Sequence, residues 1–241
     1  MSVEDYLKNL EKVEGWTRLG ACQLFLAIDE CQEHFGISKD YFEIGVHHGR
    51  SAILLGLMAK MRNKQVSVCD LFDNQERNIS KSGKGNRRIF EENYTKWVGN
   101  LENLTIYECN SSDLSNFNLE RKFGLFHIDG GHTKEETLND LNVATRYLAS
   151  GGTIIIDDAF NYKFPGVSEG LNNFFTSNSK YASLLIGKNK VVICNKDVKN
   201  EYFRYLQNEK WERVRELKQS SESMSKQKYY GQGVLIYGKR R

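Results

Sequence analysis

The chain has 241 residues, of which 39% are hydrophobic and 27% are charged, and its formal net charge is +3. This length is enough for one α/β domain with a sizeable core, and the small net charge provides no strong field to attract nucleic acid. No apolar run reaches the roughly 18 residues that a membrane span needs, and the N-terminus lacks a signal-peptide pattern. Five cysteines without a CxxC spacing indicate reduced thiols. We therefore expect a cytoplasmic protein that binds neither nucleic acid nor membrane.

The predicted elements alternate between helices and strands along most of the chain. Residues 3–34 have helical periodicity interrupted by glycines, and we take residues 1–38 as N-terminal helices that pack on a domain of residues 39–241. The predicted strands, in order, are residues 41–45, 65–70, 104–108, 123–129 and 153–158, followed by apolar runs at 182–186, 191–194 and 234–237. Helices are predicted at residues 51–61, 87–98, 135–148, 166–175 and near 202–206. This alternation predicts an α/β fold with a mostly parallel seven-stranded sheet and helices on both faces.

Acidic residues stand at the ends of the predicted strands. In an open parallel sheet the ligand binds at the carboxyl ends of the strands, near the point where the strand order reverses. The residues at these ends are Glu43, Asp70, Asp129, Asp157 and Asp158. Five carboxylates in such positions exceed what chance placement would give, so we expect the functional site at this edge of the sheet.

The first strand ends in a Glu-x-Gly-x-x-x-Gly loop at residues 42–49. Its glycines, Gly45 and Gly49, permit a tight turn and the close approach of a ligand. A dinucleotide site would show Gly-x-Gly-x-x-Gly, but here the middle glycine is absent and Glu43 precedes the first one. An acid repels a pyrophosphate and suits a cationic ligand such as S-adenosylmethionine, which carries an ammonium and a sulfonium. We expect this cofactor to bind here, with Val46 and Ser51 completing the loop.

Later strand ends complete the predicted cofactor site. Asp70 stands about twenty residues after the loop, where a carboxylate can accept both ribose hydroxyls. Ser112 and Asp113 follow the third strand, in the loop that faces adenine in this architecture. The alternative for this loop is an Asx-type cap of the next turn. Together with a contact from Asp129, these features predict an enzyme, a SAM-dependent methyltransferase.

A metal site and a base are predicted beside the cofactor. Neighbouring strands bring Asp129 together with Asp157 and Asp158, and three carboxylates repel one another unless they are protonated or bridged by a cation. Oxygen ligands of this kind suit Mg²⁺ or Ca²⁺, of which Mg²⁺ is the more available in cytosol, and the ion would hold and acidify a substrate hydroxyl. His132 is the predicted proton acceptor, with Asp129 as its catalytic partner. The alternatives are a turn that only caps the helix beginning near Thr133 and a strand end bonded to backbone.

Two segments, residues 42–56 and 126–160, resemble the class I methyltransferases that include the macrocin- and mycinamicin-type sugar O-methyltransferases. The match covers roughly residues 40–195, and catechol O-methyltransferase is more distantly similar. The resemblance implies that Asp129, Asp157 and Asp158 are Mg²⁺ ligands. It also implies that His132 is the base. The catechol enzyme has Asn as the third ligand and Lys at the base position, so the identity of the proton acceptor varies among these relatives.

The sequence thus predicts a single Rossmann-like class I methyltransferase domain. We expect it to methylate a hydroxyl of a small molecule, such as a sugar or a nucleotide-linked metabolite, and a homo-oligomer is compatible with this type. The alternatives are a metal-independent N- or C-methyltransferase and a non-catalytic SAM-binding scaffold. The basic segment at residues 81–88 is interpreted either as a lid that attracts an anionic acceptor or as a solvated loop.

Overall fold

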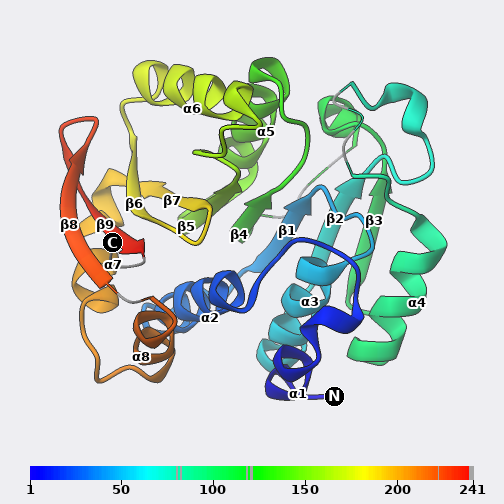
Figure 1. The fold of residues 1–241 in the computed structure, drawn as a ribbon, viewed down its shortest axis with the longest axis horizontal. Helices are drawn as coiled ribbons and strands as arrows, with labels where there is room; N and C mark the ends of the chain where they lie inside the picture. The colour runs from blue at the N-terminus through cyan, green and yellow to red at the C-terminus, as the bar shows by residue number, and fades with distance from the viewer. Residues whose placement is uncertain (80, 82, 118, 120–121, 222, 239–241) are drawn as a thin grey trace.

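The computed structural model describes residues 1–238 except 80, 82, 118, 120, 121 and 222. These residues contain one sheet with the strand order β3-β2-β1-β4-β5-β7-β6-β9-β8 (Figure 1). The strands are β1 (Asp40–Ile44), β2 (Val66–Asp70), β3 (Leu104–Glu108), β4 (Phe123–Ile128), β5 (Leu148–Asp157), β6 (Tyr181–Gly187), β7 (Lys190–Asn195), β8 (Ser223–Tyr229) and β9 (Gln232–Gly238). The five strands from β3 to β5 are parallel, whereas β7 runs antiparallel to β5 and to β6, and β8 runs antiparallel to β9.

Helices cover both faces of the sheet (Figure 1). One face packs against α1 (Val3–Lys8), α2 (Leu19–His34), α3 (Arg50–Arg62), α4 (Arg87–Val98), α7 (Lys196–Leu206) and α8 (Glu212–Gln219). The other face packs against α5 (Lys134–Tyr147) and α6 (Pro165–Ser177). Three short 3₁₀ turns are η1 (Leu10–Lys12), η2 (Gln75–Arg77) and η3 (Ser111–Asn116). None of the described helices is both long and apolar enough to cross a membrane.

The predicted fold class is confirmed, but the predicted number of seven strands is wrong. The described sheet has nine strands, because a C-terminal hairpin of β8 and β9 extends it beyond β6. Strand β8 is mostly exposed and polar, so it lacks the apolar alternation by which a strand is recognised. The predicted division between residues 1–38 and 39–241 stays a prediction, although α1 and α2 share one core with α3.

The register of the central strands places their ends side by side. Ile44 of β1 pairs with Ile128 of β4, and Ile128 pairs in turn with Ile156 of β5. All residues of β4 are buried, as expected for an inner strand covered on both faces. The residues that follow these three positions therefore emerge at one edge of the sheet, and they include Asp129 and Asp157.

Candidate active site

The glycine loop between β1 and α3 is shaped by two close contacts. Gly45 has φ +84°, and a Cβ there would lie 1.9 Å from the carbonyl oxygen of Asp129. Gly49 has φ +92°, and its Cβ would lie 2.5 Å from the ring of Phe90. Only glycine avoids both the strained conformation and the clash. The loop is thereby packed directly against the segment that carries the first of the predicted metal ligands.

Asp70 lies against this loop, at the end of β2. Its Oδ2 accepts hydrogen bonds from the backbone N–H groups of Val46, at 2.5 Å, and His47, at 3.0 Å. Its Oδ1 accepts from the N–H of Phe72 at 2.6 Å. The carboxylate thus fixes the shape of the loop by binding its backbone N–H groups. Its predicted contact with the ribose hydroxyls stays a prediction.

The loop after β3 carries the other predicted cofactor residues. The Asn110 side chain accepts from the N–H of Ser112 at 3.0 Å, so the Asx-type cap is present. Asp113 Oδ2 accepts from Arg77 Nη1 at 2.7 Å, and this partly exposed ion pair links η2 to η3. An adenine contact would have to coexist with this pair, and it remains a prediction.

The predicted carboxylates and the histidine converge at the ends of β4 and β5. Donor atoms of Asp129, His132 and Asp158 all lie within 4.8 Å of one another, and the same holds for His127, Asp129 and Asp157. Desolvation, followed by the nearby charge of Asp157, raises the pKa of Asp129 to about 7. Because Asp129 belongs to both groups of donor atoms, it lies at the centre of the cluster.

His132 and Asp158 form the pair nearest to solvent. His132 Nε2 lies 3.3 Å from Asp158 Oδ2, and each side chain is 14% exposed. The imidazole stacks on Phe164 with ring centroids 3.7 Å apart. Asp158 Oδ1 accepts from Asn161 at 2.8 Å and from Asn189 at 2.6 Å. Burial alone would raise the pKa of Asp158, but these donors and His132 lower it to about 2.

The helix-capping alternative does not describe His132. Helix α5 is capped by Thr133, whose hydroxyl accepts from the N–H of Glu136, while the Glu136 carboxylate accepts from the N–H of Thr133. This reciprocal capping box satisfies the start of the helix. His132 and Asp129 are thus not needed as caps.

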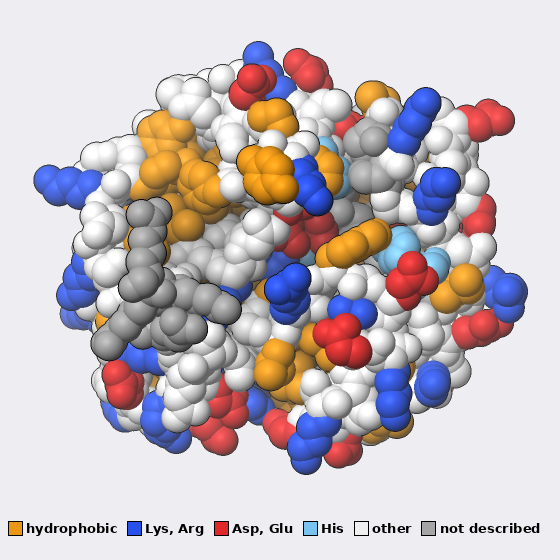
Figure 2. Space-filling view, viewed as in Figure 1, with side chains coloured by type: hydrophobic (Ala, Val, Ile, Leu, Met, Phe, Trp, Pro, Cys, Tyr) orange, Lys and Arg blue, Asp and Glu red, His pale blue; other side chains and the backbone are white. Residues whose placement is uncertain are grey.

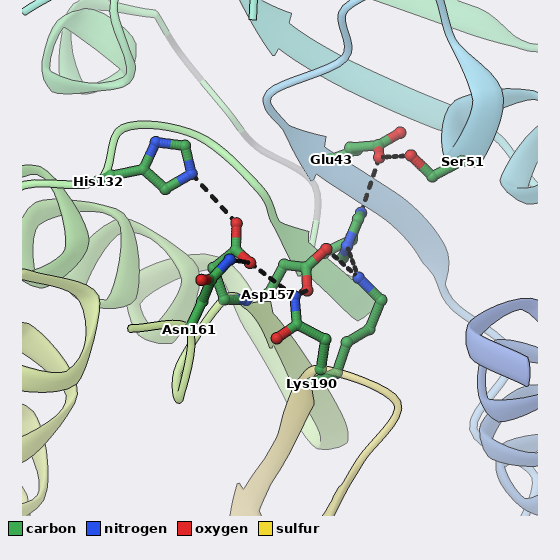
Figure 3. Close-up of polar contacts among 9 residues, drawn as sticks. Glu43, Ser51, His132, Asp157, Asn161 and Lys190 are labelled. Atoms are coloured by element: carbon green, nitrogen blue, oxygen red, sulfur yellow. Dashed lines mark hydrogen bonds and ion pairs between the residues drawn. The ribbon is translucent and has the colours of Figure 1, made fainter. Parts of the chain in front are cut away.

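Two buried residues in the cluster were missed as site residues by the sequence reasoning. Lys190, the first residue of β7, donates from Nζ to Asp157 Oδ2 at 2.5 Å and lies 3.1 Å from His127 Nε2 (Figure 3). His127 Nδ1 lies 2.7 Å from Glu43 Oε1, which also accepts from the Ser51 hydroxyl at 2.5 Å. The available signal was a lysine directly before the apolar run at residues 191–194. His127 gives no such signal, because a histidine inside a buried strand is also typical of a core residue.

The electrostatics of these buried groups are set by desolvation and by Lys190. Burial works to lower the pKa of Lys190, but Asp157 and Asp129 outweigh it and the pKa is raised, so the group is an ammonium. Burial and then the charge of Lys190 keep the pKa of His127 well below its usual value. Burial raises the pKa of Glu43 well above its usual value. Glu43 Oε2 is buried and has no hydrogen-bond partner among the described residues.

The surroundings of the cluster are aromatic and partly basic. Figure 2 shows acidic side chains near the centre of one face, between groups of hydrophobic side chains. Phe160 and Tyr162, just after the acidic pair, are 56% and 87% exposed. In the basic segment at residues 81–88, of which residue 82 lies outside the described part, Arg87 pairs with Glu91 and Glu108. That arginine is therefore already neutralised, while the lid interpretation stays a prediction.

Comparisons with known proteins agree with this architecture. A family model described as a methyltransferase domain matches residues 42–159. The solved O-methyltransferase NovP has a TM-score of 0.60 at 16% identity, over 74% of this chain and 81% of that one. The SAH-bound Podospora anserina methyltransferase PaMTH1 has a TM-score of 0.56 at 15% identity, over 79% and 86% of the two chains. The calicheamicin methyltransferase CalS11 has a TM-score of 0.55 at 15% identity, over 81% and 86%. A search of curated protein sequences finds no significant match.

At these identities the structural matches establish the fold alone. The similarity to class I methyltransferases is confirmed at that level, while the macrocin-type family stays a prediction. The domain match covers the glycine loop, both loops predicted to face the nucleoside and the acidic cluster. Residues 42–159 are thus a methyltransferase domain, set in the fold of the solved methyltransferases.

Proposed function

We propose that the protein transfers the methyl group of S-adenosylmethionine to a hydroxyl group of a small molecule, with assistance from Mg²⁺. The observation that carries this proposal is the pairing of His132 with Asp158 beside Asp129. This group stands next to the glycine loop, since Gly45 packs on the backbone of Asp129. A proton acceptor and oxygen ligands are therefore adjacent to the cofactor loop, which is the arrangement that O-methylation requires.

The residues around the loop fit the cofactor. Gly45 and Gly49 hold the loop in a positive-φ conformation that keeps its backbone packed on Asp129 and Phe90, and Glu43 Oε2 is a buried carboxyl oxygen without a hydrogen-bond partner among the described residues. A cationic ligand would satisfy such an oxygen, directly or through water. S-adenosylmethionine, when bound, supplies the methyl group and the sulfonium from which it leaves. We propose contacts from the loop (Gly45, Val46, Gly49 and Ser51), from Asp70 on the ribose side, from Ser112 and Asp113 on the adenine side, and from Asp129.

His132 is the proposed proton acceptor. In neutral imidazole one nitrogen carries the proton and the other the lone pair, and Asp158 as an acceptor selects Nε2 as the protonated one. The other nitrogen, Nδ1, would then take the proton of the acceptor hydroxyl during methyl transfer. Stacking on Phe164 holds the ring in place. The loop and this pair supply position and orientation, which account for a large part of the rate in such transfers.

The acidic residues fit a hard divalent ion in part. Asp129 and Asp158 offer carboxylate oxygens close together, which suits Mg²⁺ because it is commonly bound through one or two carboxylates. Asp157, the third predicted ligand, already accepts from Lys190 and Asn189 with its two oxygens. When bound, the ion would lower the pKa of the acceptor hydroxyl and orient it.

A sugar hydroxyl is the acceptor that we propose, free or linked to a nucleotide. Phe160 and Tyr162, which follow the acidic pair in the sequence, present exposed rings, and aromatic faces pack well on the apolar faces of sugars. CalS11 is described as a TDP-rhamnose 3'-O-methyltransferase, which makes nucleotide sugars the first acceptors to test. The small net charge of +3 supports a small-molecule acceptor over a nucleic acid.

The test combines calorimetry with transfer of a radiolabelled methyl group to nucleotide sugars, free sugars and catechols. We expect His132→Ala to lower turnover on the accepted substrate by about 100-fold or more, with the Kd for S-adenosylmethionine unchanged within about threefold. His34→Ala, an exposed histidine on α2, is the matched control. Absence of any cofactor binding would overturn the proposed function, and full turnover by His132→Ala would remove His132 from it. Chelation by EDTA should lower turnover, and unchanged turnover would reject the metal.

A further inference from the structure

We propose that Lys190 is the resident cation of the carboxylate cluster, which holds Asp157 and thereby restricts the divalent-ion site to Asp129 and Asp158. Lys190 acts here as a positioning residue, through the carboxylate that it binds. The inference rests on the proposed metal site and adds a property of this chain, namely that part of the charge a metal would neutralise is already neutralised by the protein.

The contacts of Asp157 support this role. Its Oδ2 accepts from Lys190 Nζ at 2.5 Å, and its Oδ1 accepts from the N–H of Asp158 at 2.8 Å and from Asn189 at 3.0 Å. Both oxygens thus have protein donors, and one of these donors is an ammonium, whereas the partners of Asp158 are the side chains of Asn161, Asn189 and His132. The Lys190 side chain is 1% exposed, so its ammonium cannot exchange freely between this carboxylate and water. A metal ion that used Asp157 would have to displace a buried, charge-assisted hydrogen bond.

Lys190 is held from a second side by His127. An ammonium has only donors, so His127 Nε2 accepts from it at 3.1 Å and the proton of the neutral ring is on Nδ1. Nδ1 therefore donates to Glu43 Oε1, at 2.7 Å. Figure 3 shows this row of contacts running from Ser51 and Glu43 across the strands to Lys190 and Asp157. Because the row is continuous and buried, the position of the ammonium is fixed by both ends.

A fixed positive charge inside the cluster has two consequences for a divalent ion. It repels the ion through a medium in which charges are screened less than in water, and it withholds one of the three carboxylates. Both effects weaken metal binding. Removal of the charge should release Asp157 as a ligand and strengthen binding.

The experiment is a Mn²⁺ titration of the free protein, followed by the electron paramagnetic resonance signal of the unbound ion. For wild-type protein we expect a Kd weaker than about 100 µM, and for Lys190→Met a Kd at least about tenfold tighter. Lys190→Arg keeps the cation and should bind as weakly as wild type. Lys163→Met removes one exposed charge near the cluster and is the matched control for net charge. In Asp157→Asn/Lys190→Met the gain should disappear, since the released ligand is absent.

An unchanged or weaker Kd in folded Lys190→Met would overturn the proposal, as would a wild-type Kd below about 10 µM. If circular dichroism shows that the methionine variant does not fold, Lys190→Gln provides the same neutralisation with a polar side chain and is judged by the same criterion. The titration needs neither cofactor nor acceptor. Failure of S-adenosylmethionine to bind would therefore reject the proposed function and leave the Mn²⁺ comparison to decide the role of Lys190.

Discussion

Asp70 illustrates how one carboxylate can define a cofactor loop before any ligand arrives. Its two oxygens accept three backbone N–H groups, two of them from the glycine loop. We expect Asp70→Asn to weaken S-adenosylmethionine binding by about tenfold or more, because the amide nitrogen would face N–H groups that need an acceptor. Isothermal calorimetry measures this, with Asp197→Asn on the exposed start of α7 as the control. An unchanged Kd would show that the loop does not depend on this carboxylate.

At the scale of elements, the N-terminal segment is fastened to the first turn of α3. Arg50 donates from Nε to the carbonyl of Val13 at 2.6 Å and pairs with Glu11 at 3.2 Å, while the Tyr6 hydroxyl donates to the Arg50 carbonyl at 2.6 Å. His48 of the glycine loop lies 3.2 Å from Glu14. The chain from η1 to the start of α2 is therefore tied to the loop that is proposed to hold the cofactor.

This arrangement predicts a local effect of Arg50→Met. The buried carbonyl of Val13 would lose its charged donor, so the segment at residues 10–18 should open more often. Hydrogen exchange should become at least about tenfold faster there, while exchange in α5 and α6 stays unchanged. Arg88→Met, which removes an exposed arginine from α4, serves as the control. Equal protection in both variants would mean that other contacts hold the segment.

At the scale of the whole molecule, patterning predicted the layers better than it predicted the contents of the site. Helix α4 begins and ends at the predicted residues, because its apolar and polar positions alternate at the helical period. Strand β8 is polar and lacks an apolar pattern, and helix α8 has only two buried apolar residues, Val214 and Leu217, in its eight residues. The acidic residues of the site could be predicted from the loops that follow the strands, because the carboxyl ends of parallel strands lie at the same edge of a sheet. Lys190 escaped because β7 enters antiparallel, so that its first residue, rather than its last, lies at the site.

The charges of the site also matter to the stability of the whole molecule. Asp140 on α5 is 1% exposed, and its Oδ2, which has no hydrogen-bond partner in the described part of the chain, faces Gly130. Burial raises its pKa to about 7, from an ordinary value of 3.8. Asp129 is raised to about 7 as well. Two carboxyls are thus more easily ionised in the unfolded chain than in the native one.

The sign of the pH dependence follows from that difference. Between about pH 4 and pH 7 the native state binds more protons than the unfolded state, so the free energy of unfolding falls as pH rises, by up to about 1.4 kcal/mol per pH unit for each such group. Asp140→Asn removes one group from this balance and keeps the shape of the side chain. Urea unfolding at pH 5, 6, 7 and 8 should show the variant gaining stability over wild type as pH rises, with the difference levelling off above about pH 7. Asp197→Asn, at an exposed position on α7, is the matched control. A constant difference for Asp140→Asn would instead show that Asp140 binds its proton equally strongly in the native and unfolded states. The fall in wild-type stability would then have to come from Asp129 alone.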